Sequence, residues 1–299
     1  MARRLYINFL GHKNIMFGIS AVLIAVSLGG LFVQGLNFGI EFQGGTVMDF
    51  PAIDASENQV REAFVGAGID EPSVQSVQDG GYIVRFAESD PTVANQVYQD
   101  VLKSLGLPSD SGSVTTIGPG WGDLVTNKAL VAAALAIGAI LLYISVRFDY
   151  KMSVCAVIAL VHDTVIVLGI YALSGFEVTP NTIAALLTIL GYSLYDTIVV
   201  FHRIKENTAN LSKDTFMHMA NDSINQVLVR SINTSITSLL PVVTLLAIGG
   251  PTLKDFAFAL TIGMISGAYS SIGVAAPIYA IWKETEPRYQ ALKKKYAAA

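Results

Sequence analysis

The chain has 299 residues, of which 52% are hydrophobic and 14% are charged, and its formal net charge is −4. A soluble globular domain carries about 25% charged residues. Together with a mean hydropathy of +0.52, this composition excludes an ordinary soluble enzyme or nucleic-acid-binding protein and favours a membrane protein. The one cysteine, Cys155, lies in an apolar stretch, so no disulfide can form within the chain.

Six apolar segments are each long enough to cross about 30 Å of hydrocarbon as a helix. They cover residues 15–35, 126–147, 152–174, 181–202, 226–249 and 256–282, and none shows the alternation of a barrel strand. The first apolar run is longer than the core of a signal peptide, and no Ala-x-Ala type of cleavage site follows it. We therefore expect an α-helical polytopic membrane protein with six transmembrane helices, the first of them retained.

The segment between the first two spans, residues 37–125, alternates between strand and helix patterns. Strands are expected at 45–50, 73–78, 82–87 and 113–117, with a turn at 79–81. Helices are expected from the capping box of Ser56 and Gln59 to about Ala67, and over 91–105 after a proline start. The order βαββαβ predicts a small ferredoxin-like α+β domain. Glycine-rich stretches join it to the spans, and Gly44, Gly45, Gly120 and Gly122 are the predicted domain hinges.

Charge is distributed unevenly along the chain. The 37–125 segment holds thirteen acidic residues and three basic ones, Arg61, Arg85 and Lys103. The other short loops and both termini are basic, which by the positive-inside rule places the two termini in the cytoplasm and the 37–125 domain outside. The expected organisation is a cytoplasmic segment and first span over 1–36, the extracytoplasmic domain over 37–125, spans 2–6 over 126–285, and a basic cytoplasmic tail over 286–299.

Asp196 and Arg230 are the first candidate functional pair. If the fourth and fifth spans form an antiparallel pair, the loop between them is centred near residue 213, and both residues lie seventeen positions from it. Each is about six residues inside its helix, or roughly 9 Å at 1.5 Å per residue, so both sit at one depth in the inner half of the bilayer. Two alternatives stay open: Arg230 could snorkel to the interface, and Asp196 could be a neutral, hydrogen-bonded structural carboxyl.

His162 and Asp163 form a second polar site, nearer the bilayer midplane. Successive helix residues are about 100° apart, so the two side chains are not expected on one helix face. No further ligand stands three or four residues away, so a metal site is not expected. Asp163 is either part of a helix-packing polar pair or a secondary residue of a proton or water path.

Small residues in the sixth span predict close helix packing. Gly263 and Gly267 form a GxxxG motif, and Ser270 and Ser271 lie on nearly the same stripe. Packing inside this chain and contact with another subunit are both open. The chain has no ATP-binding loop, nucleophile elbow or metal signature, so it is expected to be neither an enzyme nor dependent on a cofactor other than protons as the coupling ion.

Several motifs resemble those of the SecD/SecF family of protein-export subunits, a relative of the RND transporters. They are LNFGIEFQGG at 36–45, VHD at 161–163, ILGYSLYDTIVVFHRIKEN at 189–207, VRSINTSITSLLP at 229–241 and GGPTLKDFAFALTIGMISGAYSSI at 249–272. The likeness spans essentially the whole chain. In that family the aspartate of the GYS-x-x-D-T stretch and an arginine of the following span are proton-linked, and they map to Asp196 and Arg230.

The resemblance implies an auxiliary subunit of bacterial protein export in the inner membrane. It would pair with SecD, bind the SecYEG channel, with YajC and YidC as further candidate partners, and use the proton motive force to draw unfolded secretory chains outward. Three positions depart from the family pattern: Tyr195 where Asn is frequent, Glu41 where Asp is usual, and His202 where Asp is frequent. Tyr195, His202 and His162 are therefore candidates for tuning the relay, and sodium remains open as the coupling ion.

Two other functions remain open from the sequence. One is half of an RND-type exporter of small molecules or lipids, which would share the membrane core. The other is a scaffold that stabilises a translocon without moving ions.

Overall fold

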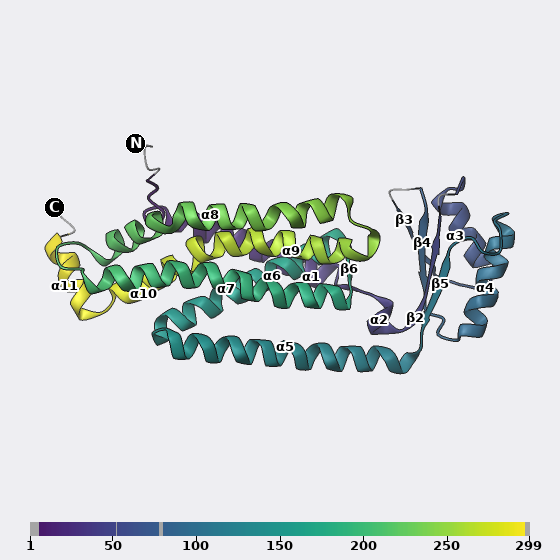
Figure 1. Cartoon of the computed structure of the whole chain (residues 1–299), viewed down its shortest axis with the longest axis horizontal. Helices are drawn as coiled ribbons and strands as arrows, with labels where there is room; N and C mark the ends of the chain where they lie inside the picture. The colour runs from purple at the N-terminus through teal and green to yellow at the C-terminus, as the bar shows by residue number, and fades with distance from the viewer. Residues whose placement is uncertain (1–5, 52, 78–79, 297–299) are drawn as a thin grey trace. The chain divides into compact units, whose positions relative to one another are not determined.

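The computed structural model describes residues 6–51, 53–77 and 80–296 (Figure 1). Among these residues, six helices are long and apolar enough to cross a membrane: 13–33, 120–147, 150–174, 180–209, 216–248 and 253–284. The chain is therefore a mostly helical, multi-pass membrane protein. Arg3 and Arg4, two of the basic residues behind the orientation argument, lie outside the described residues, as does Asp79 of the predicted turn.

The elements follow one another in this order: α1 (Lys13–Val33), β1 (Asn37–Phe38), α2 (Ile40–Gln43), β2 (Gly45–Phe50), α3 (Glu57–Gly66), β3 (Ser73–Ser76), β4 (Tyr82–Phe86), α4 (Pro91–Ser104), β5 (Ser113–Ile117), α5 (Pro119–Arg147), α6 (Tyr150–Ser174), β6 (Glu177–Val178), α7 (Pro180–Ala209), α8 (Phe216–Ile248), α9 (Pro251–Ser270), the π-helix η1 (Ser271–Ala275), α10 (Ala276–Glu284) and α11 (Pro287–Tyr296). The last apolar helix is thus α9, η1 and α10 in succession.

The chain divides into two compact units. The helical unit takes in the described parts of 1–37, 133–176 and 181–299, and the sheet unit takes in 38–132 and 177–180. The sheet unit therefore extends beyond the predicted 37–125 segment, into α5 at one end, and it also includes residues 177–180, at the junction of α6 and α7.

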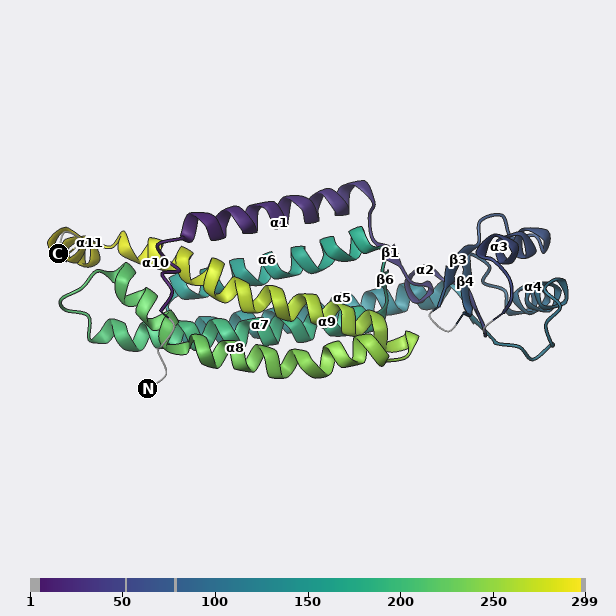
Figure 2. The same ribbon diagram turned by 90° about the horizontal axis from the view of Figure 1, so that it is seen from above.

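In the helical unit, α1, α6, α7, α8 and α9 run side by side along their length (Figure 1, Figure 2). Its largest buried cluster gathers aromatic residues at one end, where the Phe201 and Tyr279 rings are 5.3 Å apart and Phe216 lies 4.8 Å from Tyr289. Leu10, ahead of α1, is 1% exposed in the same cluster. The helix α8 begins at Phe216, ten residues before the fifth apolar run, so its polar first turns and its apolar part form one continuous helix.

The sheet unit contains a four-stranded sheet in the order β3-β4-β2-β5, with each neighbouring pair antiparallel. Strands β2 and β5 and the two helices lie where the sequence pattern predicted them, and β3 ends at Ser76, two residues earlier than expected. The capping box forms as predicted: Ser56 accepts a bond from the Gln59 backbone, and the Gln59 side chain accepts one from the Ser56 backbone. The core buries alternate residues of the strands, including Met48, Phe50 and Val84, beneath α3 and α4.

The four predicted hinge glycines all fall inside the sheet unit, and none lies at a boundary between the two units. Gly45 has φ +123, and a Cβ there would lie 2.7 Å from the Phe86 carbonyl oxygen. A Cβ on Gly122 would meet the Phe42 carbonyl, whereas one on Gly120 would meet nothing within 4 Å. Close backbone approach therefore accounts for Gly45 and Gly122, and the hinge role stays a prediction.

Gly45→Ala is expected to destabilise the sheet by about 1 kcal/mol or more, because its φ is unfavourable for a side chain and the Cβ crowds β4. Hydrogen exchange of the whole protein in detergent should show faster exchange of the β2 and β4 amides. Gly120→Ala is the matched control and should leave these rates unchanged. Equal rates in wild type and Gly45→Ala would contradict the close-packing explanation.

Candidate functional site

Asp196 lies on α7 with 3% of its surface exposed. Its Oδ1 accepts a hydrogen bond from Ser231 of α8 at 3.1 Å. The other oxygen, Oδ2, is buried and has no hydrogen-bond partner among the described residues. A buried carboxyl oxygen without a partner is costly, and such groups are concentrated at sites that exchange a proton or complete a contact with another molecule.

The direct pairing expected between Asp196 and Arg230 is not formed. Arg230 is exposed on α8, and its guanidinium makes no hydrogen bond or ion pair with the part of the chain that the structure describes. The depth argument was sound, because the contact to Asp196 comes from Ser231, the next residue. The pairing prediction was wrong about direction around the helix axis. Successive helix residues are about 100° apart, so Ser231 faces α7 while Arg230 faces outward. The functional role of each residue stays a prediction.

Asp163 on α6 is the most highly connected carboxylate of the helical unit. It is completely buried. Its Oδ1 accepts a bond from Ser266 at 2.6 Å, and its Oδ2 accepts bonds from Ser193 at 2.6 Å and Ser270 at 2.7 Å. The carboxylate therefore joins α6 to α7 and α9, a larger structural role than the secondary one that the sequence suggested.

His162 lies against the same carboxylate, with Nδ1 3.1 Å from Asp163 Oδ1. The two side chains touch although successive helix residues are about 100° apart, and both are buried because α6 has neighbours on more than one side. The other ring nitrogen, Nε2, is buried without a partner among the described residues. The ring packs near Tyr269, whose hydroxyl donates to the Met16 carbonyl of α1.

The small-residue stripe of α9 packs against α7 within this chain. A Cβ on Gly263 would collide with Ile189, and one on Gly267 would lie 2.9 Å from the Ser193 Cβ. Ser271, at the start of η1, shares a hydrogen bond of 2.9 Å with Thr197. Of the two alternatives for Gly263, Gly267, Ser270 and Ser271, packing inside the chain is the one that the structure contains.

Two of the three candidate tuning residues face away from the carboxylates. Tyr195 is 53% exposed although it precedes Asp196, and it makes no hydrogen bond with it. His202 is also exposed, whereas His162 contacts Asp163. His162 is therefore the one residue of the three that is positioned to act directly on a buried carboxylate; tuning by any of them stays a prediction.

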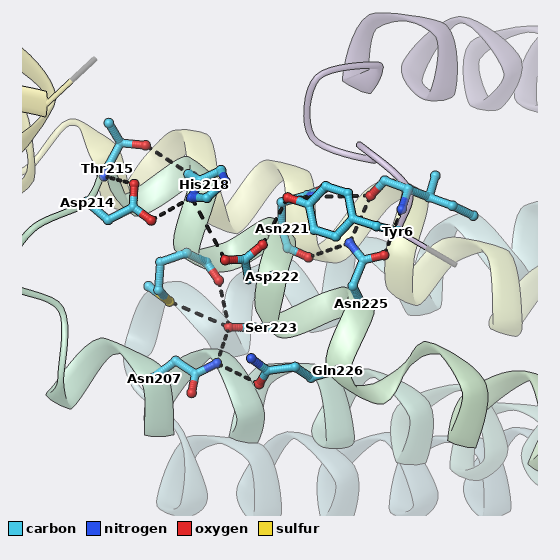
Figure 3. Close-up of polar contacts among 12 residues, drawn as sticks. Tyr6, Asn207, Asp214, Thr215, His218, Asn221, Asp222, Ser223, Asn225 and Gln226 are labelled. Carbon is cyan, nitrogen blue, oxygen red and sulfur yellow. Dashed lines mark hydrogen bonds and ion pairs between the residues drawn. The ribbon is translucent and has the colours of Figure 1, made fainter. Parts of the chain in front are cut away.

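The start of α8 carries a separate polar cluster (Figure 3). The segment before α1 is held there by two asparagines: Asn225 accepts from the Ile7 amide at 2.8 Å and donates to the Ile7 carbonyl at 2.8 Å, while Asn221 accepts from the Leu10 amide at 3.1 Å. Tyr6 donates to Asp222 at 2.9 Å, and burial raises the pKa of the Tyr6 phenol above its ordinary value. This cluster anchors the first turns of α8 to the N-terminal segment.

Within this cluster, Asp214, His218 and Asp222 bring their ligand atoms within 4.8 Å of one another, close enough to hold a metal ion (Figure 3). The sequence predicted no metal site here. The grouping also has a simpler cause, because His218 and Asp222 are four apart on α8, Asp214 lies just before the helix, and His218 Nδ1 is 2.5 Å from Asp214 Oδ2. A histidine paired in this way needs no ion.

Two family models match the chain. Residues 97–285 match protein export membrane protein SecD/SecF, C-terminal, and residues 29–52 match the SecD/SecF GG motif. The first match covers most of the chain and includes both buried carboxylates. The chain belongs to the SecD/SecF family.

Similar proteins include several protein translocase subunits SecF. The one from Streptomyces coelicolor is 42% identical over 97% of this chain and 80% of its own length. The one from Pseudomonas aeruginosa is 38% identical over 92% of this chain and 91% of its own length.

Among solved structures, SecDF from Thermus thermophilus, described as a translocon-associated membrane protein, matches with a TM-score of 0.86 and 35% identity over 94% of this chain. SecDF in a super-membrane-facing form matches with a TM-score of 0.72 and 33% identity over 99% of this chain. This chain spans 39% and 41% of those two longer chains. The SecD/SecF membership and the SecF-like length therefore agree with the resemblance seen in the motifs.

The serine cradle of Asp163 generates a prediction about stability. Asp163→Asn should destabilise this SecD/SecF protein, because an amide group would direct N–H donors toward serine hydroxyls that already donate. Each lost bond is worth about 0.5–1.5 kcal/mol. The melting temperature in detergent should fall more for Asp163→Asn than for Ser270→Ala, which removes one bond. A larger fall for Ser270→Ala would contradict the central position of the carboxylate.

Proposed function

We propose that the chain is the SecF-type auxiliary subunit of bacterial protein export, and that it works with SecD at the Sec translocon. Family membership and the length shared with SecF relatives support this proposal. The translocase relatives also favour a transport subunit over an enzyme. SecYEG is the proposed channel partner, unfolded secretory chains the proposed cargo, and YajC and YidC further proposed partners.

The proposed topology follows the charge pattern. The chain crosses the inner membrane six times with both termini in the cytoplasm, and the sheet unit is a ferredoxin-like domain on the outer side. Its strand order, β3-β4-β2-β5 with antiparallel neighbours and two helices over the core, supports this class. The basic residues in the short loops and termini on the opposite side support the outer location of 37–125.

Protons of the transmembrane gradient are the proposed energy source, with Asp196 as the residue that binds and releases them. The observation that carries this proposal is the buried Asp196 Oδ2, which has no partner in the described part of the chain. Ser231 holds the other oxygen, so the carboxyl is oriented with one oxygen left for a proton or a partner group.

Arg230 and Asp163 have different proposed parts in this relay. Arg230, exposed on α8, would bias the charge of the site from a partner-facing surface, where SecD would supply the complementary polar groups. Asp163, three of whose contacts are serine hydroxyls on neighbouring helices, would hold α6, α7 and α9 in the arrangement that sets Asp196 in place.

Asp196→Asn should abolish the part of export that depends on the proton gradient, because an amide side chain does not bind and release a proton at physiological pH. Arg230→Met should reduce it strongly. The measurement is translocation of a secretory protein into inverted membrane vesicles with and without an uncoupler, after co-purification has confirmed equal association with SecD.

Glu206→Gln is the matched control, since Glu206 is an exposed carboxylate on the same helix. It should export as wild type does. Full gradient-dependent export by Asp196→Asn, with intact SecD association, would exclude the proton relay and leave the scaffold function.

A further inference from the structure

The connection between α6 and α7 belongs structurally to the sheet unit. Residues 177–180 are part of that unit, whereas the chain on both sides of them is part of the helical unit. The two helices that it joins carry the buried carboxylates, Asp163 on α6 and Asp196 on α7. Most of the connection between these helices, together with the first residue of α7, is therefore built into the domain that lies between α1 and α5 in the sequence.

An ion pair holds this connection to the four-stranded sheet. Arg85 of β4 approaches Glu177 of β6 with 2.6 Å between Nη2 and Oε2, and the two side chains are 22% and 10% exposed. Arg85 also donates to Gln75 of the neighbouring strand at 3.1 Å, which fixes the guanidinium in place. Partial burial makes this pair less screened than the exposed pair of Arg61 and Glu57 on α3.

The ion-pair partner of Arg85 comes from outside the segment in which Arg85 itself lies. Residues 37–125 contain thirteen acidic side chains and three basic ones, so Arg85 has many carboxylates in its own segment. It pairs instead with Glu177, which is contributed by the connection between two membrane helices. An arginine that served only the solubility or packing of the sheet would not need a partner from 92 positions along the chain.

The GG-motif segment supports the same contact from a second side. The Gly39 amide donates to the Val178 carbonyl at 3.0 Å, and β1 pairs with β6. The Gly39 Cα therefore lies close to the Glu177 carboxylate, since a Cβ built there would be 3.4 Å from Glu177 Oε1.

The residue directly before Glu177 is fixed within the other unit. Phe176 stacks on Phe258 of α9 with ring centroids 4.0 Å apart and planes 11° from parallel. Gly175 accepts a hydrogen bond from the Asn37 side chain at 3.3 Å. Phe176 therefore packs within the helical unit and Glu177 pairs within the sheet unit, although the two residues are adjacent in the chain.

We propose that the Arg85–Glu177 ion pair is the positioning contact through which movement of α6 and α7 is transmitted to the sheet unit. This proposal rests on the proposed proton-driven function and extends it to the residues that couple the carboxylate site to the external domain. The pair fixes the connection to β4, so a displacement of either helix end pulls on the sheet directly.

The test exchanges the charges of the pair. Arg85→Glu and Glu177→Arg each place like charges face to face and should reduce gradient-dependent export about fivefold or more, the lower end of coupling free energies between sites. The double variant Arg85→Glu/Glu177→Arg restores opposite charges and should recover most of the export. Arg61→Glu, which disrupts the exposed pair on α3, is the matched control and should export as wild type.

The readouts separate coupling from stability. Cellular abundance, SecD co-purification and the uncoupler-resistant part of export should be unchanged in the single variants, whereas a purely structural pair would lower abundance as well. If a single variant does not accumulate, the double variant and Arg85→Lys, which keeps the charge, are compared instead. Wild-type gradient-dependent export in the single variants, or no recovery in the double variant, would overturn the proposal.

Asp196→Asn, measured in the same vesicles, separates this proposal from the function on which it rests. Loss of gradient-dependent export in Asp196→Asn, together with normal export in the Arg85 and Glu177 variants, removes the coupling proposal alone. Normal export in Asp196→Asn removes the relay itself.

Discussion

The carboxylate of Asp163 is the interaction on which the arrangement of the helical unit depends. Transfer of an isolated charged or polar group into an apolar interior is strongly unfavourable, and here the group lies in a helix with a completely buried environment. Three serine hydroxyls, one from α7 and two from α9, and the imidazole of the preceding residue on α6 offset that cost. Gly263 and Gly267 let α9 approach α7 closely, so the same helix contact supplies both hydrogen bonds and close packing.

Asp196, one helix turn beyond Ser193, is a buried carboxyl with few hydrogen-bond donors, in contrast to Asp163. It has a single donor and an unpartnered oxygen, and that donor belongs to α8. The first turns of α8 are buried and tied to the N-terminal segment by asparagines, whereas most of its apolar length is exposed, with Arg230 on that surface. The Asp196 carboxyl therefore shares none of its hydrogen bonds with the Asp163 network, and its one donor comes from a different helix.

Local patterns were enough to predict most elements, because periodicity and caps are short-range. The capping box at Ser56 and strand β5 lie where expected, and the apolar runs became the long helices. The side-chain partners were not predictable in this way. Equal spacing from a loop gives the depth of Asp196 but not the direction of Arg230, and the serines around Asp163 are 30, 103 and 107 positions away. Glu177 carried one faint signal: it is a lone acidic residue in a short connection between apolar helices.

The four crossings of the chain between its two units are not equivalent. The sheet unit is entered and left at 37/38 and 132/133 with 95 residues between, and at 176/177 and 180/181 with only four. Four extended residues span at most about 14 Å, so this short excursion permits far less displacement than the 95-residue one. It begins one residue after Phe176, which stacks on Phe258 of α9, and it carries Glu177, which pairs with Arg85 of β4. The proposed coupling therefore rests on the position of Glu177 more than on the size of the sheet unit.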